Sequence, residues 1–106
     1  MAREKFQTLT EQMFYILLCL QQECCGVNIM DKVSWMTGGR VTIGPGTLYS
    51  LLESFHKEGF IRETKVEGRK RSYQITVKGR LRLEEEFQRL RRQTEDYVRY
   101  AEGVTA

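Results

Sequence analysis

The segment from Gly44 to Gly59 constrains the fold more than any other part of the chain. Glycine is acceptable before a helix, and Pro45 suits the first helical position because its missing N–H would have no partner there. The apolar residues that follow are spaced three and four apart, which predicts an amphipathic helix to about Glu58. Its buried stripe consists of Leu48, Leu51, Leu52 and Phe55. Gly59 is well placed to close this helix in a left-handed conformation.

A short basic hairpin follows this helix. Residues 60–66 and 69–75 each read as a strand, and Glu67-Gly68 reads as the turn between them. Tyr73 and Ile75 share one face of the second strand, and we expect this face to enter the core. An amphipathic helix beside a cationic hairpin suits a nucleic-acid duplex, which combines grooves of defined shape with negatively charged phosphates.

Positive charge is concentrated in the same region. The whole sequence has a net charge of +3, but residues 40–80 alone carry +5, and the segments before and after them carry −1 each. This distribution favours contact with DNA or RNA. The alternative is that the cations only keep a strand edge soluble, since lysine also protects edges against aggregation.

Two helices and a short strand are expected before this region. Thr8 and Glu11 have the spacing of a capping box, so a first helix should begin there and end near Cys25-Gly26. A second, shorter helix is predicted from Asn28 to Met36. The alternating residues Val41-Thr42-Ile43 predict an edge strand that pairs with the hairpin.

A long final helix is predicted from Val77 towards Ala101, with Thr76 as its N-cap. Its apolar positions follow a heptad pattern, with Leu83, Leu90, Tyr97 and Val104 at one position and Phe87, Thr94 and Ala101 at the other. Such a helix would be about 37 Å long and extend beyond a single domain. We therefore expect a symmetric homodimer through this seam. The alternative is a helix that folds back on its own core.

Together these elements predict a mostly α-helical chain with a small β-hairpin. We expect a winged helix-turn-helix DNA-binding domain over residues 1–76 and a C-terminal dimerisation helix over residues 77–106. The hydrophobic content of 41% agrees with a folded domain. No apolar run reaches the ~18–20 residues that cross a bilayer, and no signal-peptide pattern is present, so we expect a cytoplasmic protein without membrane contact.

With these motifs in place, the chain resembles the PadR-like transcriptional regulators, in particular their short members with a single C-terminal helix. The resemblance covers roughly residues 9–90. Its motifs are Gly46-Thr47-Leu48-Tyr49, Gly59-Phe60-Ile61, and residues 68–76 with Gly79. The chain departs from the family at Val27, where tyrosine is common, and at Phe55, where leucine is common. The resemblance implies a dimeric DNA-binding regulator, a repressor at a palindromic operator, which a small aromatic or drug-like effector releases.

The residues expected to contact double-stranded DNA lie on the polar face of the predicted helix and on the hairpin. A recognition helix reads bases with its first turns, and hairpin cations bind phosphates or enter the minor groove. The predicted DNA-binding residues are Gly46, Thr47, Tyr49, Ser50, Lys65, Arg69, Lys70 and Arg71. For Tyr49 the alternative is packing beneath the hairpin.

A second group of aromatic and apolar residues is a candidate lining for a cavity at the dimer centre. It consists of Met13, Phe14, Tyr15, Trp35, Leu83, Phe87, Leu90 and Tyr97. By the resemblance, such a cavity receives the effector, whereas the alternative is that these residues are ordinary core. Trp35 either packs against the second helix or is exposed near the dimer centre.

Enzymes and metal proteins lack their characteristic residues here. The glycines of residues 38–46 are not followed by the Lys and Ser or Thr of a phosphate-binding loop. No sequence motif of a nucleophilic Cys or Ser is present that would pair with His56 as a catalytic base. We therefore predict no enzymatic activity, no cofactor and no metal site. Two binding alternatives stay open. One is a winged-helix module for protein–protein contact, and the other is a thiol-based, redox-responsive repressor that uses Cys19, Cys24 or Cys25.

Overall fold

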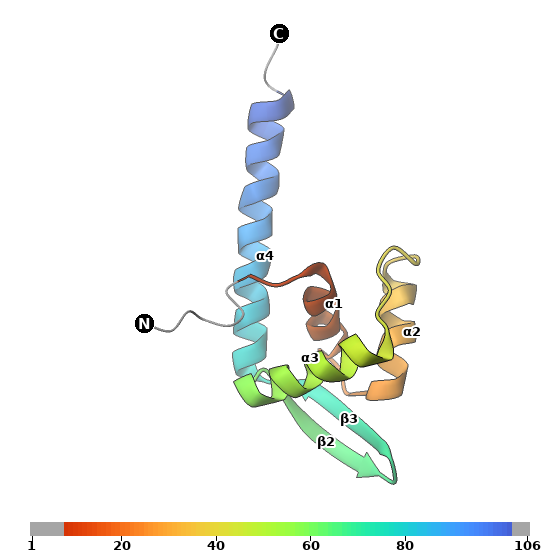
Figure 1. Ribbon diagram of the computed structural model, residues 1–106. Coiled ribbons are helices and arrows are strands. Elements are labelled where there is room, and N and C mark those ends of the chain that lie inside the picture. Colours follow the sequence, from red (N-terminus) through yellow and green to blue (C-terminus); the bar gives the residue numbers. More distant parts are fainter. Residues whose placement is uncertain (1–7, 103–106) are drawn as a thin grey trace.

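In the computed structural model, which describes residues 8–102, the first three helices pack together, a β-hairpin extends from one side of them, and the last long helix projects far beyond (Figure 1). In chain order the elements are α1 (Glu11–Cys19), β1 (Cys24–Cys25), α2 (Gly26–Met36), α3 (Pro45–Glu58), β2 (Ile61–Glu67), β3 (Lys70–Ile75) and α4 (Val77–Tyr97), which continues as a π-helical turn at Val98–Glu102. This arrangement confirms the predicted winged helix-turn-helix fold with a long C-terminal helix.

Both ends of α3 form as predicted. Gly44 is the extended N-cap residue and Pro45 occupies the first helical position. Gly59 closes the helix with a φ of 79°, in the left-handed region that glycine adopts without a steric penalty. The N–H of Phe60 then donates to the Phe55 carbonyl at 2.9 Å, which directs the chain into β2.

The predicted bounds of α1 are wrong at both ends. Thr10, not Thr8, is the N-cap, and its hydroxyl accepts a hydrogen bond from the Met13 N–H at 3.1 Å. Leu9, immediately before Thr10, is buried in the core. Because this burial fixes the position of the chain, the helix begins two residues later than the capping pattern predicted. The helix also ends at Cys19 rather than near Gly26, because the next residues must leave it to reach the sheet.

The third strand of the sheet is β1, not Val41-Thr42-Ile43. The strand order is β1-β3-β2, and Cys24 pairs with Tyr73 while Cys25 pairs with Ser72. Residues 24–25, not residues 41–43, therefore pair with the hairpin. Residues 41–43 instead run as a loop, in which Val41 and Ile43 are buried in the core.

The hairpin forms as predicted, with its turn one residue later at Gly68–Arg69. Gly68 has a φ of 62°, and one register shift between Glu63 and Lys65 makes a β-bulge in β2. Such a bulge strengthens the local twist of the strand.

Thr76 joins the hairpin to α4 and to the end of α3. It is the N-cap of α4, where its hydroxyl accepts from the Gly79 N–H at 3.1 Å and donates to the Gly59 carbonyl at 2.6 Å. A Cβ added at Gly79 would lie 2.1 Å from the Phe60 carbonyl oxygen, so only glycine permits this approach of helix to strand.

The core lies where α1, α2 and α3 meet the sheet. Its fully buried side chains include Ile16, Leu17, Leu20, Ile29, Val33, Leu48, Leu52 and Phe55. From α4, Leu83 reaches this core, whereas residues 91–100 are all exposed. The molecule accordingly measures 62 × 39 × 22 Å, with the free part of α4 along the long axis (Figure 1). Val104, predicted to continue the seam, lies outside the described residues.

We expect Leu52→Ala to lower the free energy of unfolding by about 2–5 kcal/mol, because it leaves a cavity beneath α3. Leu81→Ala is a matched control, since Leu81 is exposed on α4 and its truncation should change stability by less than ~0.5 kcal/mol. Urea denaturation followed by circular dichroism measures both values. Equal effects at the two positions would contradict the assignment of the α3 faces.

Candidate nucleic-acid interface

The first two turns of α3 present the residues that sequence analysis predicted for base contact. Gly46, Thr47 and Ser50 are exposed, and the Tyr49 side chain is 44% exposed, whereas Leu48 beside them is buried. A Cβ added at Gly46 would meet no atom within 4 Å, so the backbone here is open to a close neighbour. These residues are accessible, as groove contact requires.

The wing, defined as the hairpin of β2 and β3, presents the predicted cations. Lys65, Arg69, Lys70 and Arg71 are all exposed. The Nη1 of Arg71 donates to Oε2 of Glu63 at 2.9 Å, and this hydrogen bond raises the pKa of the Arg71 guanidinium. Arg71 is therefore held against β2 by one of its nitrogens, while the other three cations extend from the hairpin.

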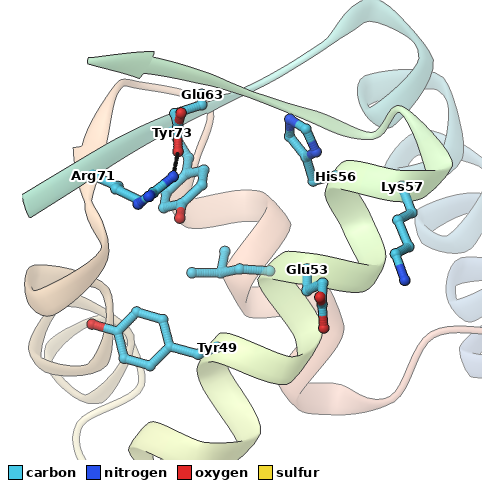
Figure 2. A pocket seen from close by; sticks show the side chains of 8 residues that line it. Tyr49, Glu53, His56, Lys57, Glu63, Arg71 and Tyr73 are labelled. Carbon is cyan, nitrogen blue, oxygen red and sulfur yellow. Dashed lines mark hydrogen bonds and ion pairs between the residues drawn. The ribbon is translucent and has the colours of Figure 1, made fainter. Parts of the chain in front are cut away.

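The larger hollow between α3 and the wing has a volume of about 500 Å³ (Figure 2). Acidic and basic side chains both face it. Its lining consists of Tyr49, Leu52, Glu53, His56, Lys57, Glu63, Arg71 and Tyr73. Because carboxylates and cations alternate around it, the larger hollow has no single charge preference.

The smaller hollow lies on the α2 side of the wing and has a volume of about 220 Å³. It is lined by Gly26, Val27, Tyr49, Arg69, Lys70, Arg71 and Tyr73. The structure thus brings four of the predicted DNA-binding residues, Tyr49 and the run 69–71, around one space. Gly46, Thr47, Ser50 and Lys65 lie outside this lining, on the exposed surfaces of α3 and β2.

Sequence analysis missed the contribution of Gly26 and Val27 to this surface. It placed Gly26 at the end of the first helix, but Gly26 is the first residue of α2, and β1 holds it beside the wing. A strand of two residues has too short a pattern to be recognised, so this placement had no local signal.

The second predicted group is only partly assembled. A cavity of about 230 Å³ lies between α1 and α4, and its lining includes Phe14, Tyr15 and Leu90. Met13 packs against the core and Leu83 is buried in it. Phe87 and Tyr97 are exposed on α4.

Trp35 does not belong to this cavity. It is 83% exposed on α2, and α1 lies between α2 and α4 (Figure 1). Of the two alternatives for Trp35, the structure thus shows an exposed side chain, and its place near a dimer centre stays a prediction. Its helical position points away from the stripe of Ile29, Val33 and Met36.

A buried carboxylate that sequence analysis did not predict also lines the α1–α4 cavity. Glu86 is 1% exposed, and Arg89 and Arg82 hold it through ion pairs. The hydrogen bond from Arg89 lowers the pKa of Glu86, although burial acts in the opposite direction. The run of glutamates at 84–86 reads as a solvated face, but Gly79, Leu83 and Glu86 share one helical stripe, which could have revealed the burial.

The three cysteines are free thiols, and for Cys19 the surroundings disfavour the reactive thiolate. Cys19 and Cys24 are buried and Cys25 is partly buried. Burial, with Cys24 as a neighbour, raises the pKa of the Cys19 thiol to about 12. A thiol with such a pKa is a poor nucleophile at neutral pH. Residues 8–102 contain no helix apolar and long enough to traverse a bilayer.

Comparison with solved structures finds the same fold in several regulators. A transcriptional regulator from Clostridium thermocellum has a TM-score of 0.73 and 20% identity, covering 88% of this chain and 98% of that one. RosR from H. salinarum has a TM-score of 0.65 and 20% identity, with coverage of 89% and 82%. ZitR of Lactococcus lactis, a zinc-responsive MarR family member, has a TM-score of 0.63 and 16% identity, with coverage of 96% and 67%.

The search of curated proteins gave no match. The family comparison is decisive, because residues 16–85 match the pattern of one family across the helices and the wing described above. The chain belongs to the PadR-like family of transcriptional regulators.

Proposed function

We propose that this protein is a dimeric DNA-binding regulator that acts as a repressor at a palindromic operator. The start of α3 enters the major groove, where Gly46, Thr47 and Ser50 approach base edges. The wing places Lys65 and Arg69 on phosphates or in the minor groove.

The observation that carries this proposal is the convergence of Tyr49 with the cations of the wing. They line one hollow beside the exposed first turns of α3. A duplex requires these features together, because shape and positive charge must face it at the same time. The first turns of α3, from Pro45 to Ser50, offer no Asn, Gln or Arg side chain for bidentate base contacts. We therefore infer modest sequence discrimination, with phosphate contacts and DNA shape supplying much of the affinity.

Dimerisation through α4 is the second part of the proposal. The exposed aromatic residues Phe87 and Tyr97 share the predicted seam with Leu90, along a helix whose residues 91–100 are all exposed. A second copy would cover these side chains and pair two α3 helices on successive turns of DNA.

The α1–α4 cavity is the proposed site for a small aromatic or drug-like effector. Its lining includes Phe14 and Tyr15, whose rings stand edge to face with centroids 5.4 Å apart. The seam residue Leu90 lines the same cavity, so an occupant there would contact the dimerisation helix directly.

We expect the affinity for a mixed-sequence duplex to fall by orders of magnitude between about 50 and 200 mM salt, because bound phosphates release counterions. Gel shift titrations at several salt concentrations measure how steeply the affinity falls as salt rises. A protein–protein interaction module would scarcely bind the duplex at the lowest salt, and that result would contradict the proposal.

Removing two cations from the wing, by Arg69→Ala with Lys70→Ala, should weaken binding alike for all duplex sequences. The slope of log affinity against log salt concentration should become shallower by about two, because two fewer counterions are released. The double variant Arg92→Ala with Arg99→Ala removes the same charge from α4, and its affinity should stay close to wild type. Equal losses in the two double variants would mean that net charge, not the wing, determines binding.

We expect the wild-type protein to sediment as a dimer in analytical ultracentrifugation. Phe87→Glu with Tyr97→Glu should shift it towards monomer, because two carboxylates per copy would enter the seam. Arg92→Glu, on the outer side of the same helix, is the control and should stay dimeric. A wild-type protein that remains monomeric at all concentrations would refute the α4 seam.

A further inference from the structure

We propose that the smaller hollow between α2, α3 and β3 is a seat for one phosphate of the DNA backbone. The hydroxyls of Tyr49 and Tyr73 and the first N–H groups of α2 donate to it, and the wing cations balance its charge. The proposal rests on the DNA-binding function proposed above. It adds a direct role for Tyr73, which sequence analysis assigned to the core, and for the start of α2, which had no predicted function.

The N-terminus of α2 forms one wall of this seat. The helix has 11 residues and begins at Gly26, and the residue before it, Cys25, makes no side-chain capping hydrogen bond. The first N–H groups of a helix have no intrahelical acceptor, and its dipole favours an anion there. Gly26 and Val27, the first two residues of α2, both line the hollow.

Tyr49 lies directly over this helix start. A Cβ added at Gly26 would lie 3.3 Å from a ring carbon of Tyr49 and 3.6 Å from its hydroxyl oxygen. The same Cβ would lie 3.7 Å from the backbone carbonyl oxygen of Arg71. Three elements that are far apart in sequence therefore meet at Gly26, and the absence of a side chain there keeps the helix start open.

Tyr73 provides independent evidence for a ligand. Its side chain is 9% exposed, and its hydroxyl forms no hydrogen bond with another described residue. Among the described residues, Thr64 Oγ1 is the one side-chain polar atom that is fully buried and has no hydrogen-bond partner. The hydroxyl oxygen of Tyr73 is therefore accessible to solvent. Tyr73 lines both hollows, and Figure 2, which looks into the larger one, shows its hydroxyl pointing away from the core.

Because the Tyr73 hydroxyl has no acceptor among the described residues and reaches solvent, it is free to donate to a bound acceptor. Burial raises the pKa of Tyr73, so the hydroxyl stays protonated and can donate. A phosphate oxygen is such an acceptor, and it carries the negative charge that the surrounding residues favour.

The charges around the hollow select an anion. Arg69, Lys70 and Arg71 line it, and none of the described residues in its lining is acidic. The Glu63 carboxylate engages Nη1 of Arg71 but lines only the larger hollow. Because a guanidinium has five N–H donors, Arg71 keeps donors for a phosphate while this ion pair holds it in place.

The test uses Tyr73→Phe and Tyr49→Phe, which each remove one hydroxyl and no charge. Binding of a mixed-sequence duplex is measured by fluorescence anisotropy over a range of salt concentrations. Each variant should bind roughly tenfold more weakly, the effect of losing a hydrogen bond to a charged group, with an unchanged salt slope. Tyr100→Phe, exposed at the end of α4, is the matched control and should bind as the wild type does.

Thermal unfolding separates this role from a structural one. Tyr73→Phe should melt at the same temperature as the wild type or higher, because it removes a hydroxyl that has no partner among the described residues. A weaker affinity that comes with a lower melting temperature would overturn the proposal, and so would unchanged affinity in both variants. Failure of the wild-type protein to bind any duplex at low salt would instead refute the proposed function itself.

Discussion

The contact between Gly79 and the Phe60 carbonyl determines how the two halves of this molecule are joined. At this point the end of α3, the start of β2 and the first turn of α4 meet within a few ångströms, and Thr76 joins them with a bond to the Gly59 carbonyl. A side chain at position 79 would force α4 away from the strand, since the opposing atoms are backbone. The direction of α4 relative to α3 is therefore rigidly set. In a dimer built on α4, that direction fixes the separation of the two α3 helices, which must match one helical turn of DNA, about 34–36 Å.

The two-residue strand β1 has a comparable effect on the other side of the fold. Pairing of Cys24 with Tyr73 and Cys25 with Ser72 holds the start of α2 against the wing. Without it, the wing would be a two-stranded hairpin, which is marginally stable alone. The pairing also explains why Cys24 is buried, so the cysteine pair has a structural reason to be there that does not involve redox chemistry.

The parts of the fold that could be predicted are those with a local signal. Gly44, Pro45 and Gly59 define the ends of α3 through their own backbone preferences, and Thr76 does the same for α4. The wrong predictions concern contacts between distant segments. Whether β3 pairs with residues 24–25 or 41–43 depends on the tertiary arrangement of α2, which no short pattern encodes. The burial of Glu86 likewise depends on α1 packing over α4, and the open hydroxyl of Tyr73 depends on the shape of the hollow beside it.

The charge pattern of the two hollows favours the smaller one as the proposed seat of a DNA phosphate. A phosphate in the larger hollow would meet two carboxylates, Glu53 and Glu63, beside its cations, whereas the lining of the smaller hollow has cations and no carboxylate. Because the interaction between two charges grows as their distance shrinks, moving a phosphate from the larger to the smaller hollow makes its electrostatic energy more favourable. In the proposed complex, the α2 side attracts the DNA backbone more strongly than the mixed charges of the larger hollow do. We infer that this preference places the first turns of α3 against the bases, although few of its side chains can read them.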